Sequence, residues 1–306
     1  MRIVVFGAGG VGGYFGARLA AAGNDVAFVA RGRHLEAIRR GGLRVKSALG
    51  DIHLEKPQAS DDPQTLGRAN VVIFTVKLWD TETAAAAARP LVVGGGVIMP
   101  FQNGVESIER IGNVLGAEHV VGGAAYIAAT ISAPGTIRHT GTMARLRFGS
   151  LLPSQTDTVK AFHAACVGAK IDAELVDDVR RIVWEKFVFL AAMSGLTSVT
   201  RCPIGPIRSD PDMRTALAAA IAENCALARA CGIELPSDFA AKQLAFADGL
   251  PAEMKSSMLH DLEAGRRLEA PWLAGAVARM ARERSLDAPV NATIYAALKP
   301  FCEGRT

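Results

Sequence analysis

The sequence has few of the features that mark specialised classes of protein. Its five cysteines show no CxxC spacing and no pairing with histidine, which argues against a zinc site and against a disulfide framework. It contains no stretch of about 18 strongly apolar residues, so we expect no membrane span. The apolar run after Arg2 ends at Gly7, too early for the core of a secretory signal. These absences predict a cytoplasmic protein with inert thiols and no metal site.

Charged residues are also sparse. They make up 21% of the chain, and the net charge of +4 is spread along it without a long basic block. A nucleic-acid partner is therefore not expected. Half of the 306 residues are hydrophobic, which suffices for a sizeable core in one large domain or two ordinary ones.

Short apolar runs and helical stretches alternate through the first half of the chain. The apolar runs predict buried strands at residues 3–6, 25–29, 71–76 and 97–100. The stretches between them predict helices at residues 11–22, 33–40 and 81–89. Strands that are buried on both faces and separated by helices indicate βαβ units and a parallel sheet. Further β-like pieces predict antiparallel or edge strands at residues 120–126, 135–140 and 145–149.

Helical periodicity dominates from about residue 177 to the end of the chain. It predicts helices at residues 179–198, 212–230, 236–246, 272–285 and 291–299. We therefore predict an α/β domain at residues 1–174 and a C-terminal all-helical domain at residues 175–306. The apolar faces of the helical domain would suit a homodimer.

The first predicted strand runs into a cluster of glycines. Residues 7–12, GAGGVG, fit the dinucleotide-binding pattern G-x-G-x-x-G, placed between a strand and a helix as that pattern requires. Gly7 would permit a tight turn, Gly9 the approach of a pyrophosphate, and Gly12 close packing of helix on strand. Gly10 and Val11 open the helix, whose free N–H groups attract phosphate. We predict a Rossmann-type domain; the alternative is a glycine-rich turn that binds nothing.

The end of the second predicted strand lacks the acid that usually holds a ribose 2′-hydroxyl. Residues 30–33 read ARGR instead. Because guanidinium pairs well with phosphate, Arg31 and Arg33 favour NADP, with its 2′-phosphate, over NAD. The alternative interpretation is that both are solvated loop arginines.

An ordered series of further motifs spans the chain. It comprises VK at residues 76–77, PFQNGV at 100–105, WEKF at 184–187, SSML at 256–259 and RRLE at 266–269. Each segment alone is weak, but with GAGGVG and ARG the series resembles the ketopantoate reductase (2-dehydropantoate 2-reductase) family. This resemblance implies a Rossmann domain followed by a helical domain. It also implies that the protein reduces a small 2-oxo acid, ketopantoate, to pantoate with NADPH in pantothenate biosynthesis.

The resemblance implies roles for individual residues in the reaction. Lys186 matches the catalytic lysine that donates a proton to the developing alkoxide, and Glu269 matches a glutamate that holds this lysine and the substrate. Asn103 matches an asparagine near the nicotinamide and the substrate. Ser257 matches a serine that binds the substrate carboxylate.

On the cofactor side, Lys77 matches a lysine of the family's cofactor site, and Arg31 matches the arginine taken to bind the 2′-phosphate. Residue chemistry supports the lysine role independently, because hydride transfer to a ketone builds negative charge on oxygen. Lys186 interrupts a dense apolar stretch at residues 183–190, as a partly desolvated acid would. The alternative interpretation is an exposed lysine on an amphipathic helix.

The helix of Lys186 departs from the family pattern. The family usually carries asparagines four and eight residues after the lysine, on the same helical face, and these places are Leu190 and Ser194 here. In the family the amides contact the substrate, including its distal hydroxyl, so their loss weakens discrimination for that hydroxyl. We keep Leu190 and Ser194 as substrate-binding positions. A relative that reduces another 2-oxo acid or ketone, with a more apolar distal group, stays open.

Two other interpretations also stay open. A catalytically silent NADPH-binding sensor would keep the fold, although it has no need of both Lys186 and Glu269. A 3-hydroxy acid dehydrogenase on a similar plan would need different motifs around the lysine. Ser257 and Glu269 would lie about 120° apart on one helix, and Gly265 and Pro271 predict a break between them.

Overall fold

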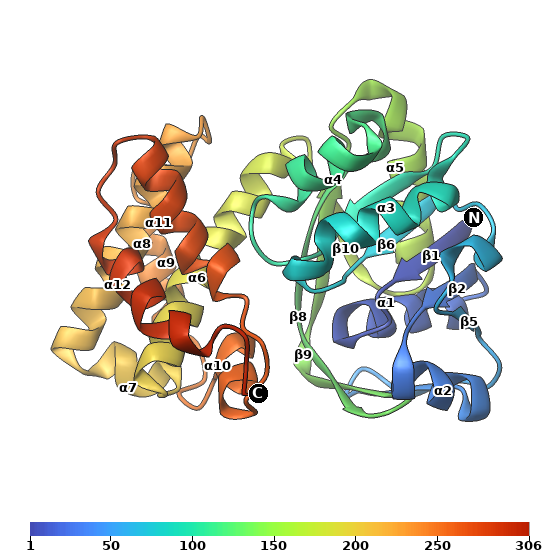
Figure 1. The fold of residues 1–306 in the computed structure, drawn as a ribbon, viewed down its shortest axis with the longest axis horizontal. Coiled ribbons are helices and arrows are strands. Elements are labelled where there is room, and N and C mark those ends of the chain that lie inside the picture. The colour runs from blue at the N-terminus through green and yellow to red at the C-terminus, as the bar shows by residue number, and fades with distance from the viewer. Residues whose placement is uncertain (306) are drawn as a thin grey trace. The chain divides into compact units, whose positions relative to one another are not determined.

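The computed structural model describes residues 1–305, which form two compact units (Figure 1). The first unit comprises residues 1–102 and 106–182, and the second comprises residues 103–105 and the chain from Val183 onward. The division falls inside one long helix, α6 (Val179–Thr200). The domain boundary that the sequence indicates, between residues 174 and 175, stays a prediction.

A five-stranded parallel sheet forms the centre of the first unit. Its order is β5–β2–β1–β6–β7, with β1 in the middle. The strands are β1 (Arg2–Phe6), β2 (Asp25–Val29), β5 (Gln58–Ser60), β6 (Val71–Phe74) and β7 (Val97–Pro100). The apolar runs predicted β1, β2, β6 and β7, so the α/β class is confirmed. β5 was not expected, because its three residues carry no apolar run.

Helices pack on both faces of this sheet. They are α1 (Gly10–Ala21), α2 (Gly32–Gly41), α3 (Thr81–Val92) and α4 (Ser107–Leu115). Alternate residues of a strand point to opposite faces, so Ile3 and Val5 join the core that contains α1, while Val4 and Phe6 join the core that contains α3 and α4. Burial on both faces explains why these strands are continuous apolar runs.

A second sheet adjoins α1 in the same unit. Its strands are β3 (Leu43–Lys46), β4 (Ile52–Leu54), β8 (Gly122–Ala133), β9 (Thr136–Gly149) and β10 (Asp172–Leu175). The sequence predicted antiparallel or edge strands here, and β8 pairs antiparallel with β9, but the pieces at 135–140 and 145–149 are one strand, β9. One further helix, α5 (Thr156–Gly168), precedes β10. β3 and β4 were missed because they are short and because polar residues interrupt both of them.

The second unit is helical, as predicted. After α6 its helices are α7 (Ile204–Ser209), α8 (Pro211–Ala230), α9 (Phe239–Asp248), α10 (Ser257–Glu263), α11 (Ala274–Glu283) and α12 (Pro289–Leu298). Among residues 1–305, α6 alone is long and apolar enough to cross a membrane. Two thirds of its apolar window is buried within the protein, and Phe187, Val188 and Ala191 belong to the core of this unit. We therefore interpret α6 as a core helix.

The hairpin of β8 and β9 places a backbone carbonyl against the start of α1. A Cβ on Gly10 would lie 2.0 Å from the carbonyl oxygen of Ala129, whereas a Cβ on Gly9 would meet nothing within 4 Å. Packing within the chain therefore requires glycine at position 10 but not at position 9. Gly10 is needed by the fold itself.

We predict that Gly10→Ala destabilises the protein, because its methyl group must push β8 away from α1. Overpacking of this kind costs about 1–3 kcal/mol, which corresponds to a fall in Tm of roughly 2–5 °C for a chain of this length. Thermal unfolding followed by circular dichroism measures the change. Gly9→Ala is the matched control and should unfold within about 1 °C of the parent. Equal Tm values for the two variants would contradict this account of Gly10.

Candidate functional site

The glycine-rich turn after β1 is tied to both neighbouring strands. The N–H groups of Gly7 and Ala8 donate to the carbonyl oxygen of Val29 at 3.1 and 3.0 Å, and the Thr75 hydroxyl donates to the carbonyl oxygen of Gly7 at 2.7 Å. Gly7 has a φ of +103°, which supports the predicted tight turn. A Cβ on Gly12 would lie 2.4 Å from the Gly7 oxygen, so Gly12 permits the close packing that was expected of it.

Gly9 supplies the test of whether this turn fits a dinucleotide. Its φ of −76° suits any residue, and open space surrounds the place where its Cβ would be. Neither strain nor packing within the chain therefore calls for glycine at this position. The first helical hydrogen bond of α1 runs from Gly13 to Gly9, so the N–H groups of Gly10 and Val11 have no acceptor within the helix. A pyrophosphate fits this arrangement of N–H donors without a helical acceptor and vacant side-chain space.

His34 of α2 contacts this turn, and the sequence did not indicate it. Its Nε2 donates to the carbonyl oxygen of Ala8 at 2.8 Å, and its Nδ1 accepts from the N–H of Gly135 at 3.0 Å. Burial lowers the pKa of His34, which favours the neutral ring that these two bonds require. The three residues lie far apart in sequence, so no local pattern could have revealed this clamp on the glycine-rich turn.

Two predicted cofactor residues, Arg31 and Lys77, lie on the first unit. Arg31 precedes α2 and forms an ion pair with Asp80, which precedes α3. Lys77 is exposed, and its ammonium lies 5.6 Å from the centre of the Trp79 ring. Asp80 was missed, because an acid was sought only at the end of β2, and Asp80 follows β6 on the other side of β1.

Three predicted residues meet in the second unit. Lys186 of α6 donates from Nζ to Oδ1 of Asn103 at 3.1 Å, and Nδ2 of Asn103 donates to Oε2 of Glu269 at 3.2 Å. The amide thus presents oxygen to the cation and nitrogen to the anion, which is the orientation that both charges require. These bonds join residues that are 83 and 166 positions apart in the sequence, and they form one polar group within an apolar helical core.

The surroundings of Lys186 change its acidity. Burial lowers the pKa of Lys186 to about 8, and the Glu269 carboxylate opposes that change by raising it. Glu269 is itself only 6% exposed. At neutral pH an amine with a pKa near 8 is still mostly protonated, yet it releases a proton far more readily than an exposed lysine.

The remaining predicted substrate residues lie in different environments. Leu190 is half-buried, and Ser194 is fully buried with no hydrogen-bond partner for its hydroxyl among the described residues. Ser257 is exposed at the start of α10, whereas its neighbour Ser256 caps that helix and bonds to Thr197 at 2.7 Å. The expected break before Glu269 is confirmed, because α10 ends at Glu263.

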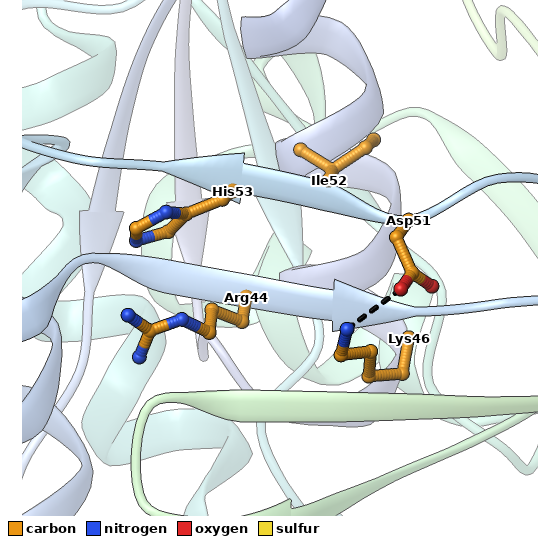
Figure 2. A pocket seen from close by; sticks show the side chains of 5 residues that line it. All are labelled: Arg44, Lys46, Asp51, Ile52 and His53. Atoms are coloured by element: carbon orange, nitrogen blue, oxygen red, sulfur yellow. Dashed lines mark hydrogen bonds and ion pairs between the residues drawn. The ribbon is translucent and has the colours of Figure 1, made fainter.

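A surface pocket of about 350 Å³ lies on the second sheet of the first unit (Figure 2). Its lining residues are Arg44, Lys46, Asp51, Ile52 and His53, from β3, β4 and the turn between them. Figure 2 shows the ion pair between Lys46 and Asp51, whose charged atoms are 2.7 Å apart. None of the predicted site residues lines this pocket, so we do not assign it to the site.

Comparisons with known proteins cover nearly the whole chain. The family model described as ketopantoate reductase PanE/ApbA matches residues 3–153, and its C-terminal counterpart matches residues 178–301. The uncharacterized oxidoreductase YkpB of Bacillus subtilis is 33% identical over 98% of this chain and 99% of its own. The 2-dehydropantoate 2-reductase of Archaeoglobus fulgidus is 32% identical over 96% of this chain and 95% of its own.

Solved structures match over the same extent. The crystal structure of 2-dehydropantoate 2-reductase from Geobacter metallireducens is 30% identical and has a TM-score of 0.91, covering 98% of this chain and 99% of that one. A ternary structure of D-mandelate dehydrogenase with NADH and anilino(oxo)acetate has a TM-score of 0.90 and covers 98% of each chain. At 17% identity, the latter likeness shows the fold alone.

We predict that Gly9→Ala abolishes most dinucleotide binding without unfolding the protein, because its methyl group fills the space that a pyrophosphate needs. A loss of affinity of at least about tenfold for NADPH is expected, since every 1.4 kcal/mol of clash is a factor of ten. Quenching of protein fluorescence on titration with NADPH measures it. Affinity unchanged from that of the parent would contradict the placement of the pyrophosphate at this turn.

We also predict that Glu269→Gln lowers the pKa of Lys186 below its value of about 8, because the carboxylate that raises it is gone. Reductive methylation with ¹³C-formaldehyde, followed by NMR titration of the Lys186 signal, measures the pKa. Glu234→Gln removes the same charge from an exposed position of the second unit and should leave this pKa unchanged. A rise on Glu269→Gln would contradict the electrostatic role of Glu269.

Proposed function

We propose that this chain, which belongs to the ketopantoate reductase family, reduces a 2-oxo acid with NADPH. Membership of the family makes it an oxidoreductase acting on CH–OH groups, with a nicotinamide dinucleotide as its cofactor. The specific substrate, the choice of NADPH over NADH and the roles of individual residues are parts of the proposal. The bonded group of Lys186, Asn103 and Glu269 is the observation that carries it.

In the proposed reaction, bound NADPH supplies a hydride to the carbonyl carbon of the substrate. The Nζ of Lys186 then donates a proton to the oxygen, where negative charge develops. Its pKa of about 8 makes this proton available near neutral pH. Asn103 fixes the direction of the ammonium through Oδ1, and Glu269 holds Asn103 in turn, so the proton donor is pre-oriented.

Features of the first unit support a nicotinamide dinucleotide as the reductant, and the arginines among them favour NADPH over NADH. Arg31 and Arg33 follow β2, where an NAD-binding domain usually has an acid. The open space at Gly9 and the free N–H groups at the start of α1 suit the pyrophosphate. We assign Arg31 to the 2′-phosphate and Lys77 to the cofactor side of the site.

Ketopantoate is the leading substrate, because the Archaeoglobus fulgidus relative is named for that reaction and the motif series of this chain resembles that of the family. Leu190 and Ser194 favour a second candidate, a 2-oxo acid whose distal group is more apolar. Leu190 carries no hydrogen-bonding atom on its side chain, so it offers nothing to a distal hydroxyl. A place in pantothenate biosynthesis follows only if ketopantoate is the substrate.

The assembly and location of the enzyme are also proposals. The second unit exposes large apolar side chains at Val199, Phe246 and Phe301, which supports a homodimer. We place the enzyme in the cytoplasm, where its five free cysteines would stay reduced.

Turnover of NADPH with a panel of 2-oxo acids tests the proposal. We expect oxidation of NADPH, followed at its near-ultraviolet absorbance, with at least one acid, and a loss of roughly 10²–10⁴-fold in kcat for Lys186→Ala. Tight NADPH binding without turnover on any acid would instead support a silent sensor. Full activity of Lys186→Ala would refute the assignment of the proton donor.

The substrate itself is decided by comparing ketopantoate with 2-oxoisovalerate, which lacks the distal hydroxyl. We predict that kcat/KM for ketopantoate exceeds kcat/KM for 2-oxoisovalerate by less than about a hundredfold in the parent enzyme. Leu190→Asn restores an amide, so this ratio should rise roughly tenfold in that variant. Leu190→Ala is the control, since it removes the isobutyl group without adding a donor. A preference of several hundred-fold for ketopantoate in the parent enzyme would rule out the apolar pocket.

A further inference from the structure

The ion pair between Arg31 and Asp80 forms across the carboxyl end of β1. Arg31 follows β2 and Asp80 follows β6, and these strands are the two neighbours of β1 in the sheet. The glycine-rich turn follows β1 between them. An acid therefore stands beside the arginine that we assign to the 2′-phosphate, although β2 itself ends without one.

The side chains of Arg31 and Asp80 differ in their exposure to solvent. The Arg31 side chain is 80% exposed, whereas that of Asp80 is 27% exposed and sits at the start of α3. Asp80 is held on the backbone by a bond from its N–H to the carbonyl oxygen of Lys77 at 2.9 Å. The acid is thus the more firmly fixed partner, and the guanidinium reaches toward it.

A bound 2′-phosphate would compete with Asp80 for Arg31, and it would also be repelled by Asp80 because both groups are negatively charged. A phosphate monoester carries a charge of about −1.5 to −2 at pH 7, so the carboxylate of Asp80 repels it. It must also share with Asp80 the donors of Arg31, or displace Asp80 from them. NADH carries a hydroxyl at the same position, which meets no such repulsion and can donate to a carboxylate.

We propose that Asp80 is a cofactor-specificity residue, which restrains the binding of the 2′-phosphate by Arg31 and so narrows the preference for NADPH over NADH. This inference rests on the proposed function for the assignment of Arg31 to the 2′-phosphate. It goes beyond it, because it names a residue that acts against the favoured cofactor.

Titration of the full-length protein with NADPH and with NADH, followed by fluorescence quenching at low ionic strength, tests the inference. Asp80→Asn keeps the shape of the side chain and removes its charge. NADPH should bind roughly three- to tenfold more tightly to Asp80→Asn than to the parent. This is the change in affinity expected when one repelling charge that is partly accessible to solvent is removed. NADH should bind equally well or more weakly. The gain for NADPH should shrink at high ionic strength, because salt screens exposed charges.

Asp51→Asn is the matched control, because Asp51 is exposed and also pairs with a cation, Lys46, on the other sheet of the same unit. Its NADPH affinity should stay within twofold of the parent. Unchanged or weaker NADPH binding by Asp80→Asn, or an equal gain in Asp51→Asn, would overturn the inference.

Arg31→Gln separates this inference from the proposed function. A large loss of NADPH affinity in Arg31→Gln, together with no gain in Asp80→Asn, overturns the role of Asp80 and leaves the cofactor assignment standing. Unchanged NADPH affinity in Arg31→Gln overturns the assignment of Arg31 and this inference with it. None of these measurements needs turnover, so a failure to find the substrate does not affect them.

Discussion

One amide group organises the polar centre of the helical unit. Asn103 accepts from Lys186 and donates to Glu269, so one amide forms a hydrogen bond with a cation and another with an anion. A buried charge is costly unless it is hydrogen-bonded, so loss of the amide would remove one such bond from each of the two charges. The tripeptide at residues 103–105 belongs to this unit although it directly follows β7 and Gln102. Asn103, which accepts from Lys186, thus lies three residues after the end of β7 in the chain.

Features that depend on local sequence were predictable. The strands β1, β2, β6 and β7 are apolar runs buried on both faces, and periodicity identified the helical second half. Lys186, Glu269 and Asn103 were found through an ordered set of motifs, not through their contacts. The short strands β3, β4 and β5 escaped prediction, because three or four residues with mixed polarity carry no distinct period.

The features that were missed depend on which strands become neighbours. Asp80 meets Arg31 only because β2 and β6 flank β1, and His34 reaches Gly135 only because the hairpin of β8 and β9 returns to the glycine-rich turn. An acid can thus lie beside the residues that follow β2 although it is far from them in the sequence. An NAD-or-NADP assignment that examines only the residues after β2 overlooks the opposite side of the site.

The two glycines at positions 9 and 10 are subject to different constraints. A side chain at position 10 would clash with a carbonyl oxygen of the chain itself, whereas a side chain at position 9 would meet no atom of the chain. A descendant of this fold that gave up its dinucleotide would still be held to glycine at position 10 but would be released at position 9. Of the two positions, only position 9 would therefore report on dinucleotide binding, because position 10 is constrained by packing within the chain.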